Sequence, residues 1–122
     1  MQHGQLRPVT LFIAGLTGLF GVISAAAASH GADPRLLGGA SAMCLAHAPA
    51  LIALYTAWPV MRTAPIAALL LSAGTALFAA DLTARHFLGH GLFPMSAPAG
   101  GVLMISGWLA VASGAFFMRK EI

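Results

Sequence analysis

The chain has 122 residues, of which 59% are hydrophobic and only 7% are Asp, Glu, Lys or Arg. Soluble domains carry about a quarter charged residues, so this composition excludes an ordinary water-soluble globule. The net charge of +3 comes from six basic and three acidic side chains, too few and too scattered for a nucleic-acid-binding surface, and we expect no nucleic-acid partner. The single cysteine, Cys44, excludes an internal disulfide.

The first apolar segment covers residues 9–29 and follows a short polar leader that contains Arg7. A hydrocarbon core about 30 Å thick is crossed by ~20 residues of helix, so the segment predicts a transmembrane helix. A cleavable signal peptide is an alternative, because a basic residue, an apolar run and the small-residue string at 25–29 also occur in such peptides. The run is longer than the ~7 to 15 apolar residues of a signal peptide, which favours a retained helix.

Three further apolar segments of similar length follow, at about 38–58, 64–89 and 99–118. Short connections separate them, and helices joined by short connections run antiparallel. The sequence therefore predicts an all-α polytopic membrane protein. We expect a single transmembrane domain over residues 1–122, an antiparallel four-transmembrane-helix bundle surrounded by the lipid bilayer.

Basic residues near the helix ends predict the orientation, since they favour the cytoplasmic side. With four crossings, both termini and the central connection share one face. Four basic residues fall on that face and two on the other, namely Arg7, Arg62, Arg119 and Lys120 against Arg35 and Arg85. We therefore expect a multi-pass membrane protein with both termini in the cytoplasm; the family resemblance described below implies that the membrane is the bacterial inner (plasma) membrane.

Small residues recur at every fourth position of the later segments. In lipid, helices associate through close packing of such residues, so these stripes predict helix contacts within the chain, in a homo-oligomer or with another subunit. The stripes are Ala42, Ala46 and Ala50, then Ala68, Ser72, Ala76, Ala80 and Ala84, then Ser106, Ala110 and Gly114. Gly15, Gly18 and Gly21 give the first segment a similarly thin side.

His47 lies near the centre of the second segment, about 15 Å from either end at 1.5 Å per residue. Ionisable groups at this depth are candidate functional residues. One interpretation is a neutral imidazole that hydrogen-bonds between helices, to Ser72, Thr75 or a backbone carbonyl. The alternative is a proton-relay or ligand role, with Met43 one turn away on the same face.

Asp81 and Arg85 are spaced i,i+4 in the third segment with the acid first, the favourable order for a helical ion pair. Counted from residue 64, Asp81 lies some 25 Å along the helix, near the outer boundary, where Arg85 can extend to water. We expect a structural ion pair there. The functional alternative is a polar entrance with the other polar residues expected at this face, His30, Asp33, His86 and His90.

His86 and His90 also have the i,i+4 spacing that lets two imidazoles bind one metal. A complete site needs further ligands, which only His30, Asp33, Met95 or Cys44 could supply, and Gly89 can end the helix before His90. We therefore favour no metal site and expect no cofactor. The candidate binding residues are His30, His47, Asp81 and Arg85.

The chain resembles the YgdD-like family of small four-helix integral membrane proteins, a domain of unknown function. The resemblance spans nearly the whole chain and depends on the order and spacing of short motifs. These are Ala28-Ser29-His30-Gly31, Leu45-Ala46-His47-Ala48, Gly74-Thr75-Ala76-Leu77-Phe78, Ala97-Pro98-Ala99-Gly100-Gly101 and Gly107-Trp108.

The resemblance implies a four-helix inner-membrane protein without an established activity, and it supplies no catalytic residues. It marks positions that recur in the family and that we would test first, namely His30, Gly31, His47, Pro98, Gly100, Gly101 and Trp108. Two departures stand out. This chain has Asp81, Arg85 and His86 where the family usually has small and aromatic residues, and Ala46 where it commonly has an aromatic residue.

Two functions from different classes are consistent with these residues. The first is a structural or accessory component that packs against a larger membrane protein complex or against itself. The second is a small conduit or binding site for a proton, a metal ion or a small apolar molecule, centred on His47 and the outer polar rim. General acid–base catalysis needs a positioned pair of groups, and the deep part of this chain offers only His47, so we expect no enzyme and no catalytic residue.

Overall fold

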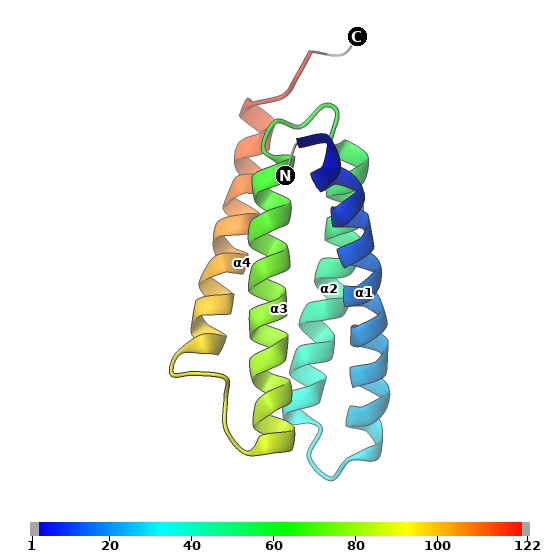
Figure 1. Cartoon of the computed structure of the whole chain (residues 1–122), viewed down its shortest axis with the longest axis vertical. Coiled ribbons are helices and arrows are strands. Elements are labelled where there is room, and N and C mark those ends of the chain that lie inside the picture. Colours follow the sequence, from blue (N-terminus) through cyan, green and yellow to red (C-terminus); the bar gives the residue numbers. More distant parts are fainter. Residues whose placement is uncertain (1–2, 121–122) are drawn as a thin grey trace.

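The computed structural model describes residues 3–120 and contains four long helices. They are α1 (His3–His30), α2 (Arg35–Ala57), α3 (Ala64–Leu88) and α4 (Ser96–Ser113), and a short 3₁₀ helix η1 (Gly114–Phe116) extends α4. All four are long and apolar enough to cross a membrane, and they run antiparallel along one axis (Figure 1). The predicted all-α, four-helix membrane architecture is confirmed.

The helices are arranged with α2 and α3 in the middle and α1 and α4 on either side (Figure 1). The main packing pairs are α1 with α2, α2 with α3, and α3 with α4, with a smaller contact between α1 and α3. The two central helices are correspondingly more buried than the two outer ones. This order leaves a groove between α1 and α3, lined by residues of both helices.

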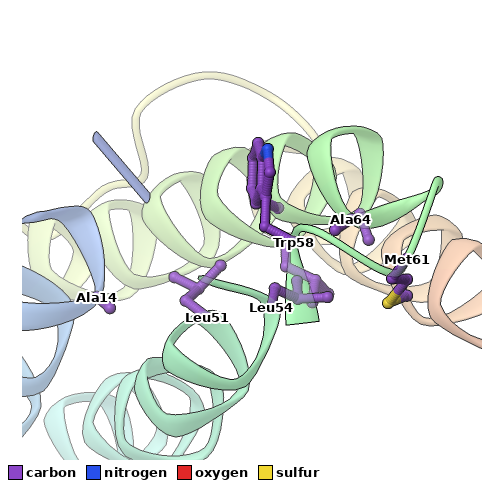
Figure 2. Packing of buried hydrophobic residues seen from close by; sticks show 9 residues of the cluster. Ala14, Leu51, Leu54, Trp58, Met61 and Ala64 are labelled. Atoms are coloured by element: carbon purple, nitrogen blue, oxygen red, sulfur yellow. The ribbon is translucent and has the colours of Figure 1, made fainter. Parts of the chain in front are cut away.

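The largest apolar cluster lies at the end of the molecule where α2 passes into α3 (Figure 2). It contains Leu51, Leu54 and Trp58 from α2 and its C-terminal cap, together with Met61 from the connection. Small residues complete the cluster, namely Ala14, Ala64, Ala67 and Ala68, with Leu71. The small side chains let large ones from neighbouring helices fill the space between backbones.

Helices α3 and α4 approach each other closely at three glycines. A Cβ added at Gly74 would lie 2.7 Å from the carbonyl oxygen of Gly100, and one added at Gly100 would lie 2.8 Å from the carbonyl oxygen of Gly74. One added at Gly107 would lie 2.6 Å from a methyl group of Leu71. At Gly74 and Gly100 only glycine fits without a shift, because backbone atoms of the other helix occupy the volume of the missing side chain.

The predicted small-residue stripes are therefore only partly right as internal contacts. The close-packed glycines of α4 and η1 are Gly100, Gly107 and Gly114. Only Gly114 among them belongs to the stripe predicted for this segment. On α2, Ala42 and Ala46 are exposed. The buried face of α2 instead carries Ala40, Ser41, Cys44, His47 and Ala48. Ser41 Oγ donates a 2.7 Å hydrogen bond to the carbonyl of Gly21, which links α2 to α1.

The helix ends differ from the predicted ones by up to six residues. Helix α1 begins at His3 rather than at residue 9, and α4 begins at Ser96 rather than at 99. Pro98 lies outside the predicted segment 99–118, but it is the third residue of α4. The first turn of a helix tolerates proline because its N–H groups have no helical acceptor.

The C-terminal end of α4 also differs, since α-helix stops at Ser113 instead of 118. The chain then pairs with the α2–α3 connection through an antiparallel bridge between Met61 and Met118. Arg119 N donates to the carbonyl of Val60 at 2.7 Å, and Arg62 N donates to the carbonyl of Phe117 at 3.2 Å. This bridge holds the segment after α4 against the start of α3.

Candidate functional site

His47 lies on the buried face of α2, and both of its ring nitrogens have hydrogen-bond partners. Nδ1 is 2.8 Å from the carbonyl oxygen of Met43, one turn earlier. Nε2 accepts a 3.1 Å hydrogen bond from the indole N–H of Trp108 on α4. The indole can only donate, so Nε2 carries no proton and Nδ1–H donates to the carbonyl. The arrangement holds one tautomer of a neutral imidazole.

The partners of His47 are not the side chains that the sequence suggested. Ser72 lies in the α1–α3 groove, and Thr75 Oγ1 is buried without a hydrogen-bond partner among the described residues. The backbone-carbonyl alternative is correct, but the carbonyl belongs to α2 itself, and the contact to another helix comes from Trp108. This indole lies 61 positions away in the chain, and only the family resemblance singled it out.

Asp81 is a buried carboxylate, with a side chain that is 0% exposed. The expected ion pair is present, with Arg85 Nε 2.8 Å from Oδ2, and Arg85 is 44% exposed. The other carboxylate oxygen, Oδ1, accepts hydrogen bonds from the backbone N–H of Leu92 at 3.0 Å and from the hydroxyl of Ser96. We call this group of four residues the Asp81 clasp.

The Asp81 clasp connects three parts of the structure: the end of α3, the connection at 89–95 and the start of α4. Ser96 is the first residue of α4, and a carboxylate beside a helix N-terminus is stabilised by the helix dipole. Gly91 lies against the clasp, where an added Cβ would be 2.9 Å from Arg85 Nη2. The connection therefore covers the carboxylate.

His86 and His90 do not keep the spacing of a helical metal-binding pair. Helix α3 ends at Leu88, and Gly89 follows with a left-handed φ of 82°, so His90 leaves the helical path. Its Nδ1 is 2.9 Å from the carbonyl oxygen of Gly91, and the His86 ring packs edge-on against Phe87. Within residues 3–120, no three His, Cys, Asp or Glu side chains are grouped closely enough to hold a metal ion.

The two remaining polar residues of the outer rim lie at the end of α1 and in the α1–α2 connection. His30 is the last residue of α1 and is exposed. Asp33 Oδ1 accepts a 3.0 Å hydrogen bond from the backbone N–H of Arg35, the first residue of α2. This bond satisfies one of the free amides at the helix start, so Asp33 forms an Asx turn around Pro34, the N-cap residue of α2.

A groove lies between α1 and α3, and it has two parts that meet at Ile13. The larger part, about 620 Å³, runs from the middle of the helices to the end of α3. Its α3 wall includes Ala76, Ala80 and Ala84 and ends at Leu88, and Leu16 and Phe20 line it from α1. We call this part the lower groove, and the smaller part, about 310 Å³, the upper groove.

The chain has four antiparallel helices of membrane-spanning length, with His47 on α2 and the glycine contact between α3 and α4. The family model for a protein of unknown function, DUF423, matches residues 24–101. The chain belongs to this family. The match covers the parts of the chain that carry His47, the Asp81 clasp and the Gly74–Gly100 contact, so these features lie in the DUF423 region. No curated protein and no solved structure matches the chain.

Proposed function

We propose that this DUF423 protein is a structural or accessory membrane component, without enzymatic activity, that packs against a further transmembrane helix at the lower groove. The observation that carries the proposal is the position of the small-residue stripe of α3. Ala76 and Ala80 are exposed and, with Ala84, line the lower groove. Small side chains let two backbones approach closely in lipid, and α3 keeps this stripe clear of its contacts with α4.

The polar residues of the membrane region support a structural role. Both nitrogens of His47 are engaged within the chain. Both oxygens of Asp81 accept hydrogen bonds, and the one from Ser96 holds α3 to α4. A conduit or a general acid–base site needs a group that can exchange protons or bind a ligand. The geometry therefore favours packing over the conduit alternative and over catalysis.

The charges support an inner-membrane location with cytoplasmic termini. Both termini and the α2–α3 connection lie at one end of the helices (Figure 1). Arg7, Arg62, Arg119 and Lys120 belong to that end, whereas Arg35 and Arg85 belong to the other. An excess of basic residues marks the cytoplasmic side, so we place this end in the cytoplasm.

Site-specific photo-crosslinking in membranes tests the packing role. A photoreactive phenylalanine analogue is placed at Phe87, which lines the lower groove and is 69% exposed, and in a matched control at Phe12, which is 66% exposed on α1 and is not among the groove residues. We expect a discrete protein adduct at position 87 and lipid adducts at position 12. The mass of the adduct distinguishes a second copy from another membrane protein.

A second variant separates docking from chance proximity. Ala80→Leu fills the lower groove without adding charge, so it should abolish the adduct at position 87 while the helical content stays unchanged. Equal adduct yields at positions 87 and 12, or an adduct that survives Ala80→Leu, would contradict the proposal.

A further inference from the structure

The upper groove lies beside the end of the molecule that carries the chain termini. Leu6, Thr10 and Ile13 line it from α1, and Ile66, Leu69 and Ser72 line it from α3. It extends over eight residues of α3, from Pro65 to Ser72, or roughly 10 Å at 1.5 Å per residue. Most of its lining residues are apolar. Because it is only about 10 Å long, the upper groove stays within one leaflet of a bilayer whose hydrocarbon core is about 30 Å thick.

Two guanidinium groups are hydrogen-bonded at the C-terminal end of α2, to carbonyls three residues apart. Trp58 borders the upper groove there, and we call this end of the groove its mouth. Arg7 Nε donates a 2.9 Å hydrogen bond to the carbonyl of Tyr55, and its Cζ lies 4.7 Å from the centre of the Tyr55 ring. Arg119 Nη1 donates at 3.3 Å to the carbonyl of Trp58, which itself lines the groove. Each of these hydrogen bonds uses one of the five N–H donors of a guanidinium, so both groups keep donors for an anion.

Among residues 3–120, the charged side chains at this end of the helices are all basic. Arg62 and Lys120 belong to the same end of the helices. Within residues 3–120 the acidic side chains are Asp33 and Asp81, and both lie at the opposite end. Guanidinium groups bind phosphate through paired N–H···O hydrogen bonds, and basic pockets between transmembrane helices bind anionic lipid headgroups.

We propose that the upper groove binds one anionic phospholipid, with its phosphate on Arg7 and Arg119 and an acyl chain along the apolar walls. The charge at the mouth is complementary to the headgroup, and the depth of the groove matches part of one acyl chain. The site is independent of the packing role proposed for the lower groove.

Native mass spectrometry of the full-length, delipidated protein in detergent tests the site. The protein is titrated with phosphatidylglycerol and with phosphatidylcholine of identical acyl chains. We expect one phosphatidylglycerol to bind more tightly than phosphatidylcholine. A basic residue near an anionic lipid surface contributes enough to change affinity about fivefold, so Arg7→Gln and Arg119→Gln should each weaken phosphatidylglycerol binding by about that factor.

Two kinds of control separate binding at this site from non-specific electrostatic binding and from non-specific hydrophobic binding of lipid. Arg35→Gln removes one exposed positive charge from the opposite end and should leave binding unchanged. Ser72→Phe fills the upper groove and should abolish binding, whereas Val102→Phe, on an exposed face of α4, should not. Arg7→Lys should retain part of the preference for the anionic lipid.

Three results would overturn the proposal: equal affinity for the two lipids, an equal loss in Arg35→Gln and Arg7→Gln, or full binding by Ser72→Phe. Arg119 and Ser72 lie on elements other than α1, so the test stands even if the Arg7 variant fails to fold. The packing role is read from protein adducts at the lower groove, so either proposal can fail without the other.

Discussion

Replacing Gly100 with alanine should separate α3 from α4. The new Cβ would lie 2.8 Å from the carbonyl oxygen of Gly74 and from the backbone nitrogen of Phe78, whereas ordinary contact begins at 3.4 Å. The backbones must therefore move apart by about 0.6 Å, since backbone atoms cannot rotate away as a side chain would. Overpacking of this kind costs about 1–3 kcal/mol.

Gly101→Ala is the matched control, because a Cβ at the neighbouring position has no atom within 4 Å. Glycine to alanine in a helix interior is favourable by up to ~1 kcal/mol, and this propensity gain is common to both variants. The difference in unfolding free energy between the two variants therefore isolates the clash. We expect Gly100→Ala to be less stable than Gly101→Ala by about 1–3 kcal/mol.

The assay is reversible unfolding in mixed micelles, followed by the fluorescence of Trp108, which lies on α4 and is 45% exposed. The double variant Gly74→Ala/Gly100→Ala adds a check. Both side chains push on the same gap, so their effects should be less than additive. Equal stability of the Gly100 and Gly101 variants, or full additivity in the double variant, would show that the close approach of α3 and α4 does not depend on these glycines.

The other predictions concern single polar contacts and use the same unfolding in mixed micelles, followed for every variant by far-ultraviolet circular dichroism because Trp108→Phe removes the fluorophore. Asp81→Asn removes the charge that Arg85 and two further donors satisfy, so we expect the free energy of unfolding to fall by about 3 kcal/mol. This is the low end of the range for a buried pair, because Arg85 is 44% exposed. A loss no greater than that of the exposed Arg35→Gln would contradict a structural role of the Asp81 clasp. Trp108→Phe keeps an aromatic ring but leaves His47 Nε2 without its donor, which should cost about 1–3 kcal/mol; unchanged stability would show that this hydrogen bond contributes nothing. Ser41→Ala removes one buried contact between α1 and α2 and should cost about 0.6 kcal/mol, with ~1.7 as an upper limit; a larger loss would mean that the hydroxyl holds more than this bond.

Local patterns in the sequence predicted the elements well and the polar pair Asp81–Arg85 correctly, because i,i+4 neighbours on a helix meet whatever surrounds them. They also warned that Gly89 could end α3 before His90, which is what the structure shows. Local patterns did not predict that Ser96 and the backbone of Leu92 complete the carboxylate's hydrogen bonds. Those contacts require the 89–95 connection to fold back over the end of α3.

Periodicity failed mainly to predict which side of each helix packs against the neighbouring helices. The stripe at Ala42 and Ala46 on α2 was expected to pack, yet it is exposed, while Ala40 and Cys44 are buried. On a helix in water the buried face is the apolar one. In lipid the outer face is equally apolar, so composition carries little information about which side meets a neighbour.

What the sequence determined by itself is the surrounding medium, the number of crossings and their antiparallel order, because a helical run of about twenty apolar residues is matched by the bilayer core. What only the tertiary structure decided is which side chains meet. The pairing of His47 with Trp108 across 61 positions, the Gly74–Gly100 contact and the open α1–α3 groove all depend on the fit of helix surfaces. Such fit is a property of residues far apart in the chain, and in lipid shape determines it more than polarity does.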